Sequence, residues 1–387
     1  ASIDFAGSLS SATLSLSSLG SISESTGAIT TGTLLGTASG AVALNGSANT
    51  IAAVGNFASN SGDFNLIDTR DLTIAGSLSA LNTTLSSAGL AVNGSIQTGI
   101  LQLASSNGVT ETGQVNAAIL TTGGSTIAGT VDMNTGNVIG TLNNFAATGD
   151  ILLNDAVALD VAGVVFTNAT LALGDTGNIS QSSGAIIAAA LTSDGGTIGG
   201  NVIFGQAGNN VPVLGNLGVT GNATFTDSST INVQGVVNVG GTLGLFSTGA
   251  ISQPSGTISA NLFNASATSI TLGDANDIVA LGSIITSGTL SVNGVSGISG
   301  VVSAQNASLQ SAGDFLLTGD TTINNNLTIS AAGNITQPNG TVTAQNTTFA
   351  VASPTDIISL SGTDMFSGDL NFASYGSVIH GGGTLDA

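Results

Sequence analysis

Residues 177–186 read Gly-Asn-Ile-Ser-Gln-Ser-Ser-Gly-Ala-Ile, and close variants of this phrase return along the chain. The five copies start at residues 20, 107, 177, 249 and 333, so successive starts are 87, 70, 72 and 84 residues apart. Self-similarity at such intervals is typical of a repeat architecture, in which each unit packs against its neighbours. The sequence therefore predicts a repeat protein, although a chain of 387 residues would otherwise suggest two or three domains.

Shorter phrases keep step with the first one. An Asn that precedes an Ile- or Val-containing run occurs at residues 49, 209 and 276, and Gly-Asp followed by an apolar residue begins at residues 62, 149 and 313. A run such as Leu-Thr-Ile-Ala-Gly begins at residues 72, 159, 231 and 290. Within these phrases apolar residues alternate with Ser, Thr, Asn or Ala, and a period of two indicates β-strands. The sequence predicts an all-β chain of short strands and turns.

A parallel β-helix explains why chemically similar phrases return at regular intervals, which an antiparallel sandwich or barrel would not. We expect coils of about 20 residues that stack about 4.8 Å apart, so that equivalent positions form ladders of like residues. A superrepeat then holds about four coils, and the chain holds about nineteen coils in a rod of roughly 90 Å. We expect a single solenoid domain over residues 1–387, made of about five superrepeats and without clear end caps.

The composition excludes several functions. Lys and Arg together number 1 against 21 Asp and Glu, which gives a formal charge of −20 and rules out the basic surface that nucleic acids and anionic membranes require. The chain has no Cys, so it carries no disulfide, thiol nucleophile or zinc finger. No run of about 18 apolar residues predicts a membrane-spanning helix. Hydrophobic residues make up 41% of the chain, which is enough to build a core.

The recurring phrases resemble the repeat region of filamentous-haemagglutinin-type exoproteins, the large secreted adhesins that Gram-negative bacteria export by two-partner secretion. The resemblance extends from about Gly20 to about Ala373. It implies a right-handed parallel β-helix on the cell surface. The N-terminal secretion domain of that family, with its Asn-Pro-Asn type of motif, is absent from this sequence, since Gln337-Pro338-Asn339-Gly340 belongs to a repeat turn. The chain is therefore expected to be a stalk segment or a relative that is exported differently.

Candidate catalytic residues are few. His380, the one histidine, lies close to the C-terminal end of the sequence, and Arg70 is flanked by carboxylates that suit a local ion pair. Asp150, Asp155 and Asp160 could form the carboxylate pair of a glycosidase, but similar Asp residues recur one superrepeat earlier. Recurrence favours turn chemistry, in which Asp accepts main-chain hydrogen bonds. We expect no catalytic residue and no enzymatic activity.

Calcium is the metal ion that best fits the sequence. Asp274, Asp277 and Asp175 offer carboxylate oxygens near predicted turns, although neither the EF-hand pattern nor the calcium-binding nonapeptide is matched. We expect these residues to be weak candidates for calcium and expect no other cofactor. Several Asn-x-Ser/Thr sequons, among them those of Asn82, Asn222 and Asn264, are explained by the abundance of these residue types.

Two classes of function are consistent with the sequence. The first is a non-enzymatic extracellular fibre, either a bacterial surface stalk or a filament of chains stacked head to tail, with a surface or host glycan or a protein receptor as partner. One tryptic site, after Arg70, suits survival outside the cell. The second is a carbohydrate-binding or carbohydrate-active β-helix, which predicts a coil that departs from the repeat and an exposed aromatic residue. With 1 Tyr and no Trp, the sequence favours the fibre.

Overall fold

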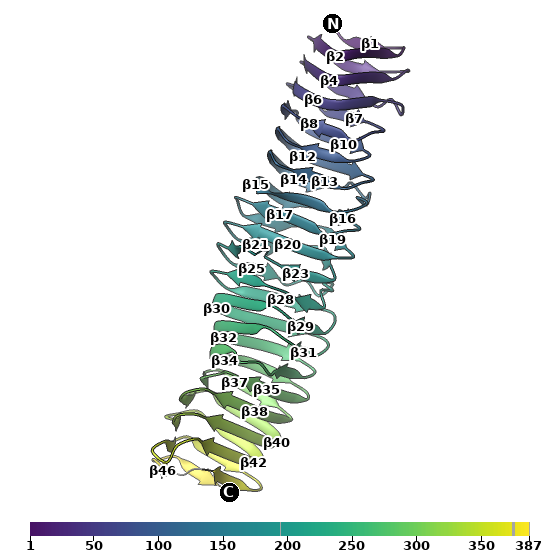
Figure 1. Cartoon of the computed structure of the whole chain (residues 1–387). Coiled ribbons are helices and arrows are strands. Elements are labelled where there is room, and N and C mark those ends of the chain that lie inside the picture. Colours follow the sequence, from purple (N-terminus) through teal and green to yellow (C-terminus); the bar gives the residue numbers. More distant parts are fainter. Residues whose placement is uncertain (194, 374–375, 387) are drawn as a thin grey trace. The chain divides into compact units, whose positions relative to one another are not determined.

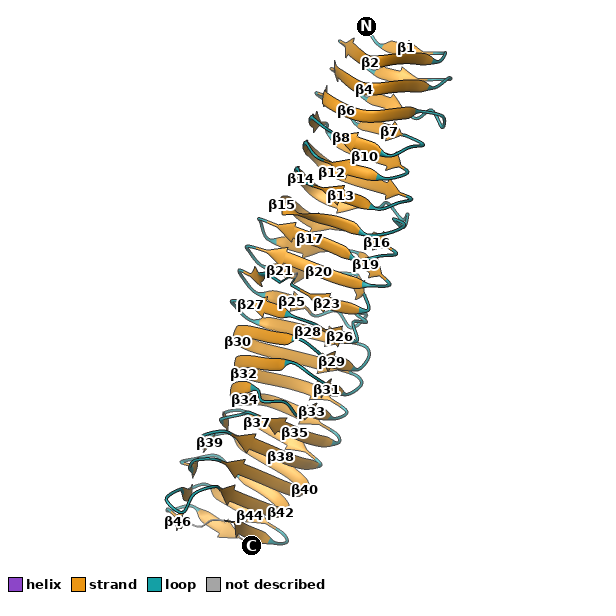
Figure 2. Ribbon diagram, in the orientation of Figure 1, coloured by secondary structure: helices purple, strands orange, loops and turns teal. Residues whose placement is uncertain are grey.

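The computed structural model describes residues 1–193, 195–373 and 376–386. These residues form strands and turns without a helix (Figure 2), and the paired strands run parallel. Strands pair with others about 20 residues away, which makes a parallel β-solenoid of about 19 turns in the described chain. The predicted fold class is confirmed. The chain divides into two compact units, Ala1–Gly200 and Asn201–Ala387.

The first unit consists of stacked coils of short strands (Figure 1). Its strands are β1 (Ile3–Phe5), β2 (Leu9–Ser18), β3 (Ile22–Glu24), β4 (Ile29–Ala38), β5 (Val42–Leu44), β6 (Thr50–Ser59), β7 (Phe64–Ile67), β8 (Leu72–Ile74), β9 (Ser77–Ser79), β10 (Asn82–Ser87), β11 (Leu90–Val92), β12 (Ser95–Ser105), β13 (Val109–Glu111), β14 (Gln114–Thr121), β15 (Val131–Leu142), β16 (Phe145–Ala147), β17 (Ile151–Asp155), β18 (Leu159–Val161), β19 (Val164–Thr167), β20 (Thr170–Asp175), β21 (Ile179–Gln181), β22 (Ala185–Ile187), β23 (Ala190–Thr192) and β24 (Thr197–Ile198).

The register within the first unit places inward-facing residues directly above one another. Ile3 pairs with Ile22, Ile22 with Val42, and Val42 with Phe64. Successive members are 19, 20 and 22 residues apart, so the coils differ in length at their turns while the inward positions stay aligned. Strands β16, β19 and β22 form a separate parallel sheet of three strands.

The second unit repeats the same construction. Its strands are β25 (Val202–Phe204), β26 (Val213–Leu214), β27 (Leu217–Val219), β28 (Ala223–Asp227), β29 (Ile231–Val233), β30 (Val236–Ser247), β31 (Ile251–Gln253), β32 (Thr257–Ala267), β33 (Ile270–Leu272), β34 (Asp277–Thr286), β35 (Thr289–Asn293), β36 (Gly297–Ile298), β37 (Val301–Ala304), β38 (Asn306–Ser311), β39 (Phe315–Leu317), β40 (Asp320–Ala331), β41 (Ile335–Gln337), β42 (Val342–Val351), β43 (Ile357–Leu360), β44 (Thr363–Phe366), β45 (Leu370–Ala373), β46 (Ser377–His380) and β47 (Thr384–Asp386). One inward ladder pairs Ala223 with Leu243 and Leu243 with Phe263.

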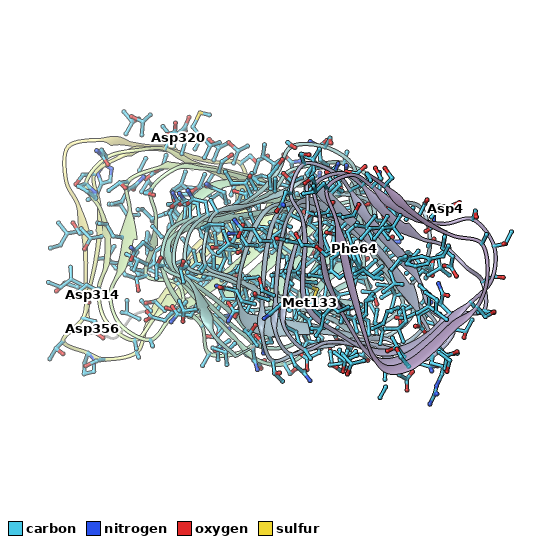
Figure 3. The ribbon with its side chains drawn as sticks, turned by 90° about the horizontal axis from the view of Figure 1, so that it is seen from above. Asp4, Phe64, Met133, Asp314, Asp320 and Asp356 are labelled. Atoms are coloured by element: carbon cyan, nitrogen blue, oxygen red, sulfur yellow. The ribbon has the colours of Figure 1, made fainter. Side chains whose placement is uncertain are left out.

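The core of each unit follows from the alternation in the sequence, because side chains of a strand point to opposite faces in turn. Phe64 and Met133 lie inside the coils of the first unit, whereas Asp4 lies on the outside (Figure 3). In the second unit Asp314 and Asp320 lie on the outside (Figure 3). Phe rings meet across neighbouring strands, with centroids 5.1 Å apart for Phe57–Phe64 and 5.8 Å apart for Phe204–Phe225.

Glycine has a specific role in the first phrase. Three residues after its Glu or Gln stands a Gly with positive φ in four copies, namely Gly27, Gly184, Gly256 and Gly340. At Gly256 φ is 84°, and an added Cβ would overlap the carbonyl oxygen of Gly235 in the preceding coil. A left-handed turn stacked on another backbone accepts only Gly without strain. Gly235 ends one of the short runs that keep step with the first phrase, and this contact gives a physical reason for that spacing.

The described residues form no helix with the length and apolarity that a membrane span requires.

Candidate functional site

Each copy of the first phrase places one long polar side chain at the end of a three-residue strand. Strands β3, β13, β21, β31 and β41 each read apolar, polar, then Glu or Gln. The third residue points inward with the first because side chains alternate along a strand. The side chains in the last four strands are almost fully buried, with exposed fractions of 7% for Glu111, Gln181 and Gln253 and 1% for Gln337.

In β3, β13, β31 and β41 this side chain is bonded to an Asn or Asp in the following coil. The Nδ2 of Asn49 donates to Glu24 Oε2 over 2.8 Å, and that of Asn137 donates to Glu111 Oε2 over 2.9 Å. Gln253 and Asn276 donate to each other, over 2.7 Å and 3.0 Å. We call the four pairs the corner pairs, and the fourth joins Gln337 to Asp364 over 2.8 Å. Each pair binds one coil to the next.

The oxygen of each Asn or Asp in the corner pairs also closes the turn that follows the Glu or Gln. Asn137 Oδ1 accepts the main-chain N–H of Val115 over 2.8 Å, and Asn276 Oδ1 accepts that of Ile258 over 2.8 Å. The same bond runs from Ile29 to Asn49 and from Val342 to Asp364. A buried N–H without a partner is costly, so this acceptor satisfies the backbone where the ladder of strand bonds is interrupted.

A second row of buried carboxylates acts in the same way. Asp155 accepts the N–H of Ile139 at both of its oxygens, over 3.1 Å and 3.2 Å, and Asp175 accepts the N–H of Leu159 over 3.1 Å. Asp68 and Asp227 accept main-chain N–H groups of Ile51 and Val211, one coil earlier in the chain. These Asp side chains therefore serve the backbone, which is the turn role that the sequence predicted for the recurring Asp residues.

Burial disfavours the ionised form of several of these carboxylates. Loss of solvation raises the pKa of Asp155 to about 6, which the N–H groups of Ile139 and Ala156 oppose and the nearby Asp175 charge reinforces. Burial likewise raises the pKa of Glu111, of Asp68 and of Asp175. Glu111 Oε1 is buried and has no hydrogen-bond partner among the described residues. The interior of the first unit thus contains carboxylates that are partly stabilised in their protonated form.

The candidate calcium residues do not come together. Asp175 is buried in the first unit and bonded to the backbone, whereas Asp277 is exposed at the start of β34 in the second unit. The N–H of Asp274 donates to Gln253 Oε1 over 3.3 Å. Among the described residues no group of three or more His, Cys, Asp or Glu side chains is placed to hold a metal ion. Weak calcium binding stays a prediction.

The residues that were considered for catalysis are also separate. His380 is exposed at the end of β46, and Arg70 is exposed in the turn between β7 and β8. Asp150 accepts the N–H of Thr170 over 2.9 Å, and Asp160 accepts that of Ser182 over 3.0 Å. The carboxylates of Asp150 and Asp160 therefore accept hydrogen bonds from main-chain N–H groups of the next coil.

The sequon asparagines have a structural role that their abundance alone did not reveal. The Oδ1 atom of Asn222 accepts the N–H of Thr242 over 2.7 Å, and Asn264 Oδ1 accepts that of Ser283 over 2.8 Å. Asn82 accepts the N–H of Ile100 over 3.1 Å in the same way. An outward Ser or Thr two residues later follows from strand alternation. In these three sequons the Asn side chain thus bonds one coil to the next.

Sequence reasoning missed the corner pairs. The two members of a pair are 23 to 27 residues apart, as in Gln253–Asn276 and Gln337–Asp364. The available signal was that the Asn of the second phrase, at residues 49 and 276, follows the Glu or Gln of the first phrase at a nearly constant interval. The interval indicates a repeat, but by itself it does not identify a contact between coils.

The stacked coils and the corner pairs define the class of protein as a parallel β-solenoid with internal polar ladders. In comparisons with known proteins, no family model, no curated protein and no solved structure matches the chain.

Proposed function

We propose that this protein is a non-enzymatic structural β-solenoid of a bacterial cell surface, which acts as an extracellular stalk or as the subunit of a head-to-tail filament. One observation carries the proposal. The polar side chains that recur with the repeat, in the corner pairs and in the row of Asp155 and Asp175, are bonded to the neighbouring coils. Side chains engaged in this way hold the solenoid together rather than face a substrate.

The extracellular setting is supported by the composition and by the repeat phrases. The phrases resemble those of filamentous-haemagglutinin-type exoproteins, and the absence of Cys suits export of an unfolded chain that folds outside the cell. Folding by nearest-neighbour contacts can propagate from coil to coil as the chain emerges. A single basic side chain leaves one tryptic site, which suits an environment that contains proteases.

Head-to-tail stacking would join the strand edges of one chain to those of the next by main-chain pairing. Val378 in β46 is 47% exposed, although its register partner Ile358 is fully buried. Ile3 in β1 is half-buried, whereas its partner Ile22 is fully buried. In the filament form, a second copy would place its own apolar side chains in register with those of these strands.

Electron microscopy of the purified chain at neutral pH, with and without millimolar calcium, tests the proposal. Unbranched filaments much longer than the roughly 90 Å of one chain indicate a polymer, and single rods indicate a stalk segment. Compact particles without elongation would contradict both forms. Val378→Asp, which places a carboxylate at an exposed strand edge, should abolish filaments, whereas the matched change Val279→Asp, at a side chain that is 54% exposed on β34, should not.

A further inference from the structure

One coil of the first unit departs from the regular pattern. Between β14 and β15 the chain makes a loop at residues 122–130, in which Gly123 and Gly124 both have positive φ, 61° and 86°. The N–H of Ser125 donates to the carbonyl of Thr122 over 3.0 Å and tightens the loop. The Thr122 hydroxyl donates to the carbonyl of Asn144 over 3.0 Å and fastens the loop to the next coil. The loop is therefore held in place by specific bonds.

The loop forms one wall of an open cavity of about 430 Å³. The floor of the cavity is the outer face of the three-stranded sheet, where β16 and β19 lie side by side (Figure 1). Ala146 and Phe166 are register partners on that face, and Val164, which is 43% exposed, lies beside Phe166 on β19. Nine Phe side chains are exposed by 5% or less, whereas the half-buried ring of Phe166 offers an aromatic surface on the outer face.

The chemistry of the walls is neutral and polar. None of the residues that line the cavity, all of them within the described part of the chain, carries a charge. Ser125 and Thr126 are exposed and place hydroxyl groups at the rim of the cavity. Asn144 uses its Oδ1 to accept the N–H of Val164 over 3.1 Å, which orients its amide at the edge of the cavity. Hydroxyl groups both donate and accept hydrogen bonds, as do those of a sugar.

We propose that this cavity binds a neutral saccharide, whose ring packs on Phe166 while its hydroxyl groups bond to Ser125, Thr126 and Asn144. An aromatic floor with a few polar groups at the rim is the usual composition of a small-ligand site. The proposal adds a binding activity to the structural role and does not depend on filament formation.

Other ligands fit the cavity less well. A charged ligand would be desolvated without an opposite charge, and the net charge of −20 repels anions. An extended peptide that adds a strand requires a free sheet edge, but β19 is paired on both sides, with β16 and with β22. A neutral molecule with an apolar face and a polar perimeter needs neither an opposite charge nor a free strand edge.

Saturation-transfer NMR with the full chain and a panel of oligosaccharides tests this site. The neutral probes are cellotetraose, maltotetraose, mannotriose, lactose and triacetylchitotriose, and tetragalacturonate is the acidic probe. We expect at least one neutral probe to receive saturation and tetragalacturonate to receive none. Phe166→Ala should weaken binding of the positive probe about tenfold in titration calorimetry, because the aromatic face is lost.

Matched variants separate the site from the rest of the surface. Phe246→Ala removes another half-buried Phe, in β30 of the second unit, and should leave the affinity unchanged. Thr126→Val removes a rim hydroxyl at nearly constant volume and should weaken binding several-fold, with the circular dichroism spectrum unaltered. Absence of saturation for every neutral probe, or equal affinity of the Phe166→Ala and Phe246→Ala variants, would overturn the proposal.

Discussion

Glu111 occupies a position where three other copies of the phrase have Gln. Its Oε2 accepts from Asn137, but its Oε1 is buried without a partner among the described residues, and burial raises its pKa. In the second unit both polar atoms of the Gln253 amide are bonded to Asn276. Glu111→Gln should therefore increase the free energy of unfolding near pH 7.5 by about 1 kcal/mol, because it removes a desolvated charge and supplies a donor.

The pH dependence of this gain has a definite sign. A carboxyl with a raised pKa in the folded state binds more protons folded than unfolded, so it costs stability as pH rises above its ordinary value. The advantage of Glu111→Gln should accordingly be larger near pH 7.5 than near pH 5, as measured by urea unfolding at both values. The exposed Asp277→Asn change is the control. A variant no more stable than the parent near pH 7.5 would show that the unpartnered oxygen carries no cost.

Asp155 gives a second prediction at this scale. Its side chain is fully buried, and burial raises its pKa from 3.8 to about 6 despite the bonds from Ile139 and Ala156. Between those two pH values the folded chain holds a proton that the unfolded chain has lost, so the free energy of unfolding falls as pH rises through this window. Asp155→Asn keeps an acceptor oxygen for Ile139 and removes the ionisation, so we expect a flatter dependence in urea unfolding from about pH 4 to 6.5.

The control for Asp155 is again Asp277→Asn, which should reproduce the slope of the parent chain. Equal slopes for the parent and for Asp155→Asn would show that another group dominates this pH range. Asp175 is the first such group to consider, because it lies near enough for its charge to raise the pKa of Asp155 and is itself a buried carboxyl with a raised pKa.

Among the elements, the turn of the first phrase is the most constrained. Gly256 has φ of 84°, and a Cβ there would meet the backbone of Gly235. Gly256→Ala should lower the free energy of unfolding by about 1–3 kcal/mol, since an L-residue is strained at this φ and must displace a neighbouring coil. Gly273→Ala is the matched control, because nothing lies within 4 Å of its added Cβ, and its effect should stay within about 0.5 kcal/mol. Chemical denaturation measures the free energy of unfolding of both variants. Equal losses for Gly256→Ala and Gly273→Ala would contradict the stacking argument.

The strands could be predicted from the sequence because their alternation is local. Short runs such as Ile179–Gln181 and Ile251–Gln253 are strands in the structure, and the parallel stacking follows from the recurrence of whole phrases. The corner pairs could not be derived in the same way. The coil length varies between neighbouring coils, as in the steps of 19, 20 and 22 residues along one ladder, so a separation of 23 or 27 residues does not by itself identify a neighbour.

The cavity beside Phe166 also could not be predicted from the sequence. Alternation alone places Phe166 on the outer face, yet the cavity forms only when β16 and β19 pair and the loop at residues 122–130 lies beside β16 as its wall. The Thr, Gly and Ser residues of the loop match the composition of other turns, so the sequence does not distinguish it from them. Its positive φ values at Gly123 and Gly124 are visible only in the structure.

For the whole molecule, charge is the dominant long-range feature. A net charge of −20 with one cationic side chain means that nearly all long-range charge interactions are repulsive. Sodium chloride raised from about 10 to 150 mM shortens the Debye length and should raise the melting temperature by on the order of 2 °C. Calcium chloride at equal ionic strength should give a larger shift if the surface carboxylates bind calcium weakly. Differential scanning calorimetry measures both, and a melting temperature that falls with sodium chloride would contradict the argument.

The corner pairs also constrain how such a chain can lengthen over generations. Gln253 and Asn276 lie in adjacent coils, so a gene duplication that copied one coil of about 20 residues would separate a donor from its acceptor and leave a buried amide unbonded. A copied segment that contains both members preserves the pair. The intervals of 70 to 87 residues between phrase copies are long enough to contain both members of a pair, so a block of several coils can be copied without breaking one.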